Sequence, residues 1–274
     1  MLSMPRPLYA APIDALADRY DESFSESRIG QAQRSAVWKE LEKSFHSGDH
    51  VLEVGCGTGV DACFLGNRGV HVVACDCSPR MVAVAARRVG ETGNSELVRP
   101  QLLAAEQICD LRADHPFDGA FSNFGALNCV QDLRRFASDL APLLRTGAPV
   151  LLCLMGPSCL WEMIWYVAHG KPEKAFRRFH REGLDARLAD GATVHVTYPT
   201  VRSLTRTFAP EFQLKAVQGI GLSVPPSYLE PLALRFPRAF AVQKQIDSFL
   251  EKIPGIRSLA DHILLKFERT GGVA

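Results

Sequence analysis

The chain has 274 residues, a net charge of +1 and an isoelectric point of about 7.6, so no overall electrostatic field draws it to nucleic acid. Its apolar fraction of 47% is ordinary for a globular protein, and no apolar run reaches the ~20 residues that a membrane span needs. The first 12 residues lack a signal-peptide pattern, and eight cysteines without zinc-site spacing indicate reduced thiols, no metal and a cytoplasmic protein.

The first 155 residues are predicted to alternate strands and helices. One or two helices are expected within residues 15–45. Strands are then expected at 51–54, 70–75, 97–104, 117–122 and 149–154. Helices are expected between them at 61–68, 79–89 and 133–144. Short connections in a βαβ alternation predict a parallel sheet that is covered by helices on both faces.

Beyond residue 155 the pattern changes. The expected order is an aromatic helix, a basic segment, a hairpin, a short helix, a strand, proline-broken helices and a last strand, at 159–168, 171–181, 186–198, 201–208, 212–217, 225–253 and 262–267. The hairpin is expected to turn at Asp190-Gly191. Residues 155–200 and 219–260 are interpreted as insertions that cap the sheet.

A glycine-rich turn lies between the first strand and its helix. Gly55, Gly57 and Gly59 alternate there, and such a turn lets the backbone approach a ligand at a helix N-terminus. Asp76, at the end of the second strand, stands where nucleotide-binding folds hold a ribose. Val60 replaces the last glycine of the dinucleotide fingerprint, which disfavours NAD.

These motifs resemble those of the class I S-adenosylmethionine-dependent methyltransferases. The run Glu53–Gly59 is similar to their first motif and Cys75–Met81 to their second, within a resemblance over roughly residues 15 to 155. The branch that it resembles acts on small molecules and includes the ubiquinone- and menaquinone-biosynthesis enzymes. The resemblance implies S-adenosyl-L-methionine as the cofactor and S-adenosyl-L-homocysteine as the product.

The fold that the resemblance implies is α/β, with a Rossmann-like, seven-stranded, mostly parallel sheet and helices on both faces. We expect one structural domain in three parts: N-terminal lid helices (1–46), a cofactor-binding core (47–155), and the rest of the sheet with substrate-cap insertions (156–274).

The resemblance also implies roles for individual residues. Asp76 would hold both ribose hydroxyls, and Cys77 and Met81 would lie beside the adenine. Ala104 departs from the third motif, which commonly has Asp there, and leaves adenine to the Ala105 backbone and Glu106. The predicted cofactor residues are Tyr20, Glu53, Gly55, Cys56, Gly57, Gly59, Asp76, Cys77, Met81, Ala105, Glu106 and Asn123. Tyr20 is interpreted as a lid residue, or alternatively as a residue of helix packing. Asn123 is interpreted as a cofactor or acceptor residue, or alternatively as a turn residue.

The acceptor is predicted to lie among the loops that follow the later strands, because ligands of open parallel sheets bind at the carboxyl ends. The predicted pocket residues are Phe24, Phe124, Trp161, Trp165 and Tyr228. An aromatic stripe at helical spacing can equally be plain core. The candidate bases are Glu162, His195 and Tyr198, although a base is needed only if the acceptor loses a proton.

The predicted function is transfer of a methyl group to a small, largely apolar or aromatic acceptor by in-line displacement. The alternatives are a non-methylating or regulatory cofactor-binding protein on the same fold, and an NAD-dependent oxidoreductase. The expected partners are the small-molecule acceptor and no nucleic acid, with the chain a monomer or homodimer. The basic residues Lys171, Lys174, Arg177, Arg178 and Arg181 form either a solvated face or a membrane-surface contact.

Overall fold

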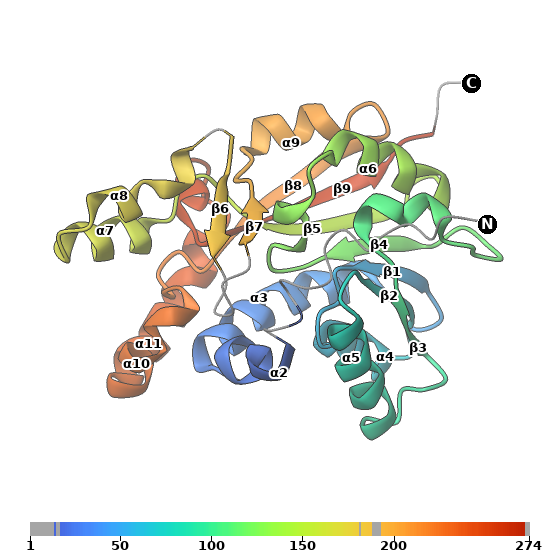
Figure 1. The fold of residues 1–274 in the computed structure, drawn as a ribbon, viewed down its shortest axis with the longest axis horizontal. Coiled ribbons are helices and arrows are strands. Elements are labelled where there is room, and N and C mark those ends of the chain that lie inside the picture. The colour runs from blue at the N-terminus through green and yellow to red at the C-terminus, as the bar shows by residue number, and fades with distance from the viewer. Residues whose placement is uncertain (1–13, 15–16, 181, 188–192, 272–274) are drawn as a thin grey trace.

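The computed structural model describes residues 14, 17–180, 182–187 and 193–271, and it has a seven-stranded sheet at its centre (Figure 1). The strand order is β3-β2-β1-β4-β5-β9-β8, and only β9 runs antiparallel to its neighbours. The strands are β1 (His50–Val54), β2 (His71–Asp76), β3 (Val98–Leu102), β4 (Gly119–Ser122), β5 (Pro149–Met155), β8 (Phe212–Ile220) and β9 (His262–Arg269). The predicted fold class is thereby confirmed.

Helices cover both faces of the sheet, as the sequence pattern predicted. One face carries α3 (Arg28–Ser44), α4 (Val60–Gly66) and α5 (Pro79–Glu91), and the other α6 (Leu133–Leu140) and α9 (Val201–Phe208). Residues alternate between the faces along a strand: Val51 packs with the first group, and Leu52 and Val54 pack with the second. Short 3-10 helices complete the connections, namely η2 (Ala105–Asp110), η3 (Ala126–Cys129) and η4 (Ala141–Leu143).

Strand β3 contains Pro100, a residue type that is unfavourable inside a sheet. The sheet order explains it, because β3 is an edge strand with β2 as its only neighbour. Proline has no N–H to donate, and on an edge strand the side without a neighbour can carry this gap, so that the sheet loses no hydrogen bond.

The cap is built from the two segments that follow β5 and β8. The first contains α7 (Leu160–Ala168), α8 (Pro172–Ala175), η5 (Arg177–Phe179) and the hairpin strands β6 (Leu184–Arg187) and β7 (Thr193–Val196). The second contains η6 (Ser227–Leu229), α10 (Glu230–Arg235), α11 (Pro237–Leu250) and η7 (Ile256–Leu259). The predicted turn at Asp190-Gly191 lies outside the described residues. Among the described helices, none has both the length and the apolar character that crossing a bilayer requires.

The N-terminal segment begins with α2 (Ala17–Tyr20) and a π-helical turn, η1 (Asp21–Ser25). Helix α3 begins after Ser27, whose hydroxyl accepts a hydrogen bond from the Gly30 amide.

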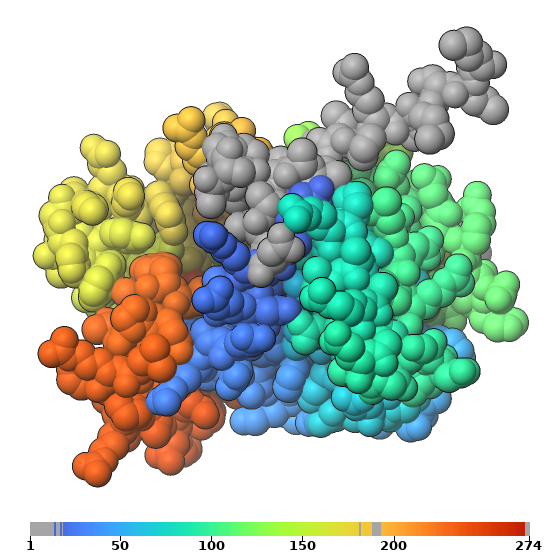
Figure 2. Space-filling model, turned by 60° about the horizontal axis from the view of Figure 1, so that its bottom comes forward, coloured from blue at the N-terminus to red at the C-terminus, as the bar shows by residue number. Residues whose placement is uncertain are grey.

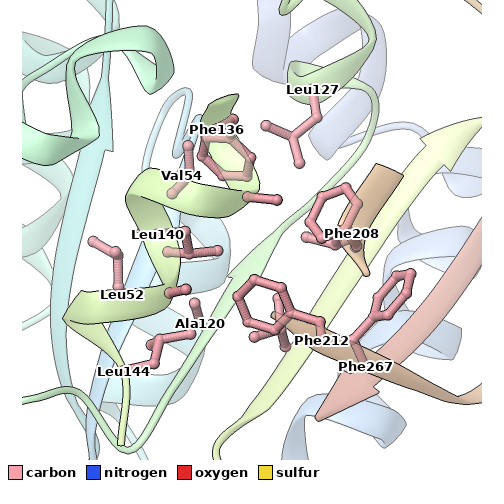
Figure 3. Close-up of a cluster of buried hydrophobic side chains, with 14 of the residues drawn as sticks. Leu52, Val54, Ala120, Leu127, Phe136, Leu140, Leu144, Phe208, Phe212 and Phe267 are labelled. Atoms are coloured by element: carbon pink, nitrogen blue, oxygen red, sulfur yellow. The ribbon is translucent and has the colours of Figure 1, made fainter. Parts of the chain in front are cut away.

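The larger of the two sheet-face cores is aromatic where α9 meets β8 and β9 (Figure 3). The Phe208 ring is fully buried and stacks on Phe267 with 5.1 Å between centroids. It also lies 5.8 Å from Phe212 and 6.4 Å from Phe136. The Phe208 ring therefore anchors α9, which follows the cap segment, to the face of the sheet.

We expect Phe208→Ala to lower the free energy of unfolding by about 3–5 kcal/mol, because it removes a buried ring and leaves a cavity between α9 and the sheet. Urea unfolding followed by circular dichroism measures this. The control is Leu102→Ala on the edge strand β3, where the side chain is 55% exposed and the expected change is within about 0.5 kcal/mol. Equal effects of the two substitutions would contradict this account of the core.

Candidate functional site

Loops at the carboxyl edge of the sheet enclose a cavity of about 290 Å³. Its lining comes from the loops after β1, β2, β3 and β4, from the end of β5, from Tyr20 and from the β6–β7 hairpin. The position agrees with the rule that open parallel sheets bind ligands at this edge.

The glycine loop after β1 has a left-handed backbone at each of its three alternating glycines. The φ angles are +75° at Gly55, +52° at Gly57 and +77° at Gly59. A Cβ on Gly55 would lie 2.2 Å from the Ala126 side chain, and one on Gly59 would lie 2.9 Å from that of Ala85. A Cβ on Gly57 would meet nothing within 4 Å, although Gly57 lines the cavity. The loop thus needs glycine for packing at two positions and offers open space to a ligand at the third.

Asp76 ends β2 with its carboxylate at the cavity. One oxygen accepts from the Gly57 amide at 2.8 Å and the other from the Ser78 amide at 2.9 Å. Burial raises the pKa of this carboxyl, and the backbone amides of Ser78 and Gly57 act in the opposite direction. Each carboxylate oxygen keeps acceptor capacity for a further donor.

The N-terminal segment crosses the loops that carry both motifs. Asp14 accepts from the Ser78 hydroxyl, which caps α5. Asp21 accepts from the Thr58 hydroxyl at 2.7 Å and pairs with Arg88. Tyr20, between these anchors, lines the cavity, and burial raises its pKa to about 12, so the hydroxyl stays protonated.

A buried ion pair lies behind the cavity. Arg34 of α3 and Asp61 of α4 are 2.6 Å apart, and Asp61 also accepts from Nδ2 of Asn123 at 2.9 Å. Asn123 lines the cavity, and its Oδ1 is buried with no partner among the described residues. An orphaned acceptor of this kind fits a polar ligand donor.

Phe124 follows Asn123 and also lines the cavity. Its φ of +51° is unusual for a bulky residue, and such strain is concentrated at functional sites. The Arg34 guanidinium lies 4.9 Å from the Phe124 ring centroid and 5.4 Å from that of Phe24. Phe24 packs on Phe124 at 4.9 Å without lining the cavity.

The far end of the cavity is apolar. Its lining there comes from η3, the end of β5 and the hairpin, namely Leu127, Val130, Met155, Ala186, Val194 and Val196. Asn128 holds the three elements together: its Nδ2 donates to the carbonyls of Met155 and Thr197, and its Oδ1 accepts from the Met155 amide. The sequence analysis did not select these residues; the alternation of Val194 and Val196 about an exposed residue was the available signal.

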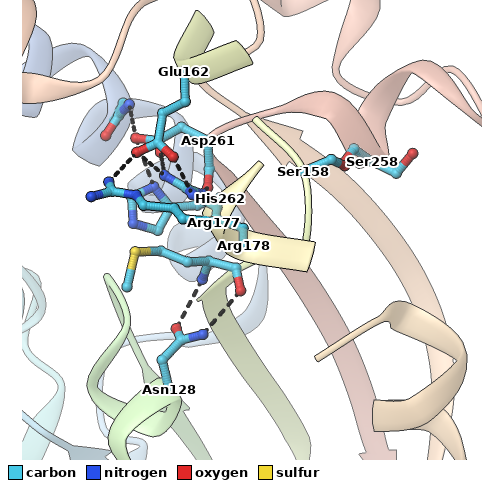
Figure 4. A network of polar contacts seen from close by, with 10 residues as sticks. Asn128, Ser158, Glu162, Arg177, Arg178, Ser258, Asp261 and His262 are labelled. Atoms are coloured by element: carbon cyan, nitrogen blue, oxygen red, sulfur yellow. Dashed lines mark hydrogen bonds and ion pairs between the residues drawn. The ribbon is translucent and has the colours of Figure 1, made fainter. Parts of the chain in front are cut away.

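Glu162, the favoured base candidate, is held in an ion-pair network (Figure 4) and is not among the residues that line the cavity. Its carboxylate is 2% exposed and accepts from Arg177 at 2.6 Å and from Nε of Arg178 at 2.9 Å. Arg178 also pairs with Asp261 at 2.7 Å. These contacts occupy Glu162 structurally and do not support its prediction as a base. They also turn two members of the basic run inward, and a third, Arg181, lies outside the described residues.

The other two base candidates also lie outside the cavity lining. His195 points to the surface and pairs with Asp185 at 2.8 Å, which raises the pKa of the imidazole. Tyr198 lies beside Arg178, with 5.7 Å between the guanidinium carbon and the ring centroid. For His195 the physical reason is the hairpin pleat, which directs Val194 and Val196 inward and His195 outward.

The aromatic residues of the cap also depart from the predicted pocket. Trp161 and Trp165 pack on the cluster that joins α3, α10 and α11, and Trp161 donates to the Ser223 carbonyl. Tyr228 is 43% exposed and stacks on Tyr166. These residues fasten α7 to α10 and α11, because an amphipathic helix buries its apolar face on the nearest partner.

Of the predicted cofactor residues, nine line the cavity: Tyr20, Gly55, Gly57, Asp76, Cys77, Met81, Ala105, Glu106 and Asn123. Glu53, Cys56 and Gly59 lie behind them in the strand and loop. Glu53 is 1% exposed, and burial raises the pKa of its carboxyl well above the usual value.

The comparisons with known proteins agree with this geometry. Residues 51–147 match the family model of a methyltransferase domain. The demethylmenaquinone methyltransferase of Thermobifida fusca is 30% identical over 147 residues, which cover 53% of this chain and 59% of that protein. O-methyltransferase resE of Aspergillus sclerotiorum is 30% identical over 161 residues, 58% of this chain and 56% of that protein. The chain thus spans little more than half the length of these curated relatives.

A similar solved structure is geranyl diphosphate C-methyltransferase from Streptomyces coelicolor in complex with Mg²⁺, geranyl diphosphate and S-adenosyl-L-homocysteine. Its TM-score is 0.53 at 14% identity, with 86% of this chain and 79% of that chain covered, so the likeness is one of fold. Over the matched region, the fold, the two motif loops and the family match make the chain resemble the class I S-adenosylmethionine-dependent methyltransferases. Among these it resembles the menaquinone-biosynthesis type.

We expect Arg178→Met to lower the free energy of unfolding at neutral pH by about 3–5 kcal/mol, because it leaves Glu162 and Asp261 without their shared cation. Burial alone would raise the pKa of Asp261, but His262 and Arg178 outweigh it and hold the pKa below its usual range. Wild-type Asp261 therefore contributes stability above its unfolded pKa of ~3.9 and loses it as the pH falls further.

In the variant, Asp261 loses one of the two cations that hold its pKa down, so the cost of its buried charge fades as the carboxyl is protonated on acidification. The stability difference should narrow as the pH falls from about 7 to about 4.5 in urea titrations. Lys174→Met, at an exposed cation one helix earlier, is the matched control. A difference that does not vary with pH would count against the network.

Proposed function

We propose that the protein transfers the methyl group of S-adenosyl-L-methionine to a small, largely apolar or aromatic acceptor by in-line displacement. The observation that carries the proposal is one continuous cavity with a polar end and an apolar end. The polar end is made by the two motif loops and the apolar end by η3, β5 and the hairpin.

The polar end fits the cofactor residue by residue. Asp76 would accept from the two ribose hydroxyls, and Gly57 leaves open space for close approach of the methionine part. The orphaned Oδ1 of Asn123 would accept from an ammonium group. Met81, Cys77, Ala105 and Glu106 would surround the adenine, with Ala104 leaving its recognition to the backbone and Glu106.

When bound, the cofactor supplies a methyl group that its sulfonium charge has already activated. The chain's task is then to place the acceptor in line at about 3 Å and to exclude water. Of the titratable groups described in the lining, Tyr20 keeps its proton, and burial raises the pKa of Cys77 to about 12 and of Cys129 to about 11. Asp76 and Glu106 belong to the cofactor end. We therefore infer catalysis by positioning, on an acceptor that is nucleophilic without a protein base.

The apolar end indicates the acceptor class. The lining there carries no charge and consists of Leu127, Val130, Met155, Val194 and Val196. An apolar acceptor that is buried against these side chains would gain about 25 cal/mol of binding free energy per Å² of surface removed from water. An aromatic or isoprenoid-like molecule with one nucleophilic atom fits this lining.

We expect Asp76→Ala to weaken S-adenosyl-L-methionine binding by at least about 100-fold, because two hydroxyl donors lose a charged acceptor. Isothermal titration calorimetry measures it, with S-adenosyl-L-homocysteine and NAD as comparison ligands. Asp110→Ala, at an exposed carboxylate near η2, is the control. A thermal melt checks that the glycine loop survives loss of the Gly57 contact. Unchanged affinity, or binding of NAD alone, would refute the assignment.

We expect Val194→Asp to lower kcat/KM for the best acceptor by at least about 10-fold, because a carboxylate in the apolar lining must be desolvated. The acceptor comes from a screen of quinols, phenols, thiols and amines for methylated product. Affinity for S-adenosyl-L-homocysteine should not change. Thr193→Asp, at the exposed neighbouring position, is the control. Equal turnover by both variants would remove the hairpin from the acceptor site.

A further inference from the structure

Helix α11 presents a row of large apolar side chains to solvent. Val242, Ile246 and Phe249 are 54%, 41% and 78% exposed, and Ile253, just past the helix end, is 40% exposed. Steps of four, three and four residues place side chains on one face of a helix. These four residues are called the α11 stripe below.

The stripe is not the face by which α11 packs on the body. Phe240 makes that contact and is 7% exposed in a cluster with Ile29 and Leu229. Asp247 lies on the packed side too, where it accepts from the Ser223 hydroxyl at 2.7 Å. The helix therefore has a packed side and a second apolar side that the fold leaves in water, and contiguous patches of this kind mark interaction sites.

The acidic and basic side chains near the stripe differ in exposure: the acidic ones face the body of the protein, and most of the basic ones face solvent. Between residues 230 and 257 the three acidic side chains face the body: Glu230 accepts from the amides of Arg28 and Ile29, Asp247 from Ser223, and Glu251 lies half-buried beside Gln218. The exposed charges of this segment are all basic: Arg235, Arg238, Lys244 and Lys252. The segment thus combines exposed apolar residues with an outward field that is positive.

We propose that the α11 stripe and the cations Arg235, Arg238 and Lys252 form a docking surface for an anionic lipid bilayer. Lys244 lies on the packed side of α11, with Asp247. Apolar side chains of an interfacial helix enter the headgroup region, and the flanking cations gain from negatively charged lipids. A second copy of the chain fits less well, because a two-fold contact would bring the same cations against one another. The inference does not depend on the proposed reaction.

The position of α11 in the fold connects the docking surface with the N-terminal segment. Helices α10 and α11 project at one end of the molecule, beside α7 (Figure 1). The space-filling view shows the N-terminal segment between α10–α11 and the glycine-loop side (Figure 2). Glu230 of α10 caps α3, so the docking surface is fastened to the helix that follows Tyr20. A bilayer bound at the stripe would therefore contact helices that are joined to the N-terminal segment, which carries Tyr20 of the cavity lining.

The test is flotation of the full chain with vesicles of phosphatidylcholine containing one third phosphatidylglycerol, and with vesicles of phosphatidylcholine alone. We expect binding to the anionic vesicles and at least about 10-fold weaker partitioning to the neutral ones. Raising the salt from about 0.1 M to about 0.5 M should weaken the anionic binding, because the Debye length shortens.

Two variants separate the contributions. Ile246→Asn with Phe249→Ser removes the centre of the stripe, and Arg235→Gln with Arg238→Gln and Lys252→Gln removes the cations beside it. Each should weaken partitioning at least about 10-fold while the thermal midpoint stays unchanged, since these side chains are exposed. The matched controls lie across the molecule: Leu102→Ser, 55% exposed on β3, and Arg87→Gln with Arg99→Gln and Arg112→Gln. The controls should bind as the wild type does.

Three outcomes would overturn the proposal. The wild type could fail to bind anionic vesicles, or the control variants could lose binding as much as the stripe variants. Analytical ultracentrifugation could also show self-association that Ile246→Asn with Phe249→Ser abolishes, with no vesicle binding, which would assign the stripe to a second copy of the chain. Loss of methyl transfer in either stripe variant is not required, so failure here leaves the proposed function standing.

Discussion

The carboxylate of Asp61 joins three segments that are distant in sequence. It pairs with Arg34 of α3, accepts from Trp38 and Asn123, and belongs to the first turn of α4 behind the glycine loop. A charge with 4% side-chain exposure is stable only when partners compensate its desolvation. The relative positions of the N-terminal helix, the glycine loop and the cavity rim therefore depend on this buried pair, and so does the orientation that leaves Oδ1 of Asn123 free.

Two parts of the chain line the cavity, and they contribute different kinds of groups. The motif loops bring backbone amides, Asp76 and left-handed glycines, which suit a polar, nucleotide-like ligand in any acceptor context. The hairpin, η3 and β5 bring apolar side chains that are positioned through Asn128. The described residues of the second part contribute no base to the lining, so selectivity and rate would both arise from shape and desolvation. Changes in the hairpin would then alter the preference for the acceptor without altering the binding of the cofactor.

Local patterns were sufficient for the sheet and its loops, because strands, helix starts and left-handed glycines follow from short-range sterics and burial. They were insufficient for the cap. Trp161, Trp165 and Glu162 have the composition of a pocket, yet the tryptophans bury against α10 and α11 and Glu162 meets Arg178 of η5. Arg178 is 16 residues from Glu162, and Ser223, which accepts from Trp161, is 62 residues away. The sequence around α7 contains no pattern that predicts either partner. The face on which His195 lies could not be predicted locally either, because a shift of one residue along a strand reverses the face of each side chain.

The sequence by itself determined the fold class and the polar half of the site. The spacing of Gly55, Gly57, Gly59 and Asp76 is tied to one strand–turn–helix unit and the strand beside it, and such units form wherever their pattern occurs. Only the tertiary structure decided which cap residues line the cavity, which cations turn inward and which face of α11 stays in water. Those outcomes depend on which surfaces pair after the chain has folded back on itself, and burial of one face leaves another exposed only once its partner is known.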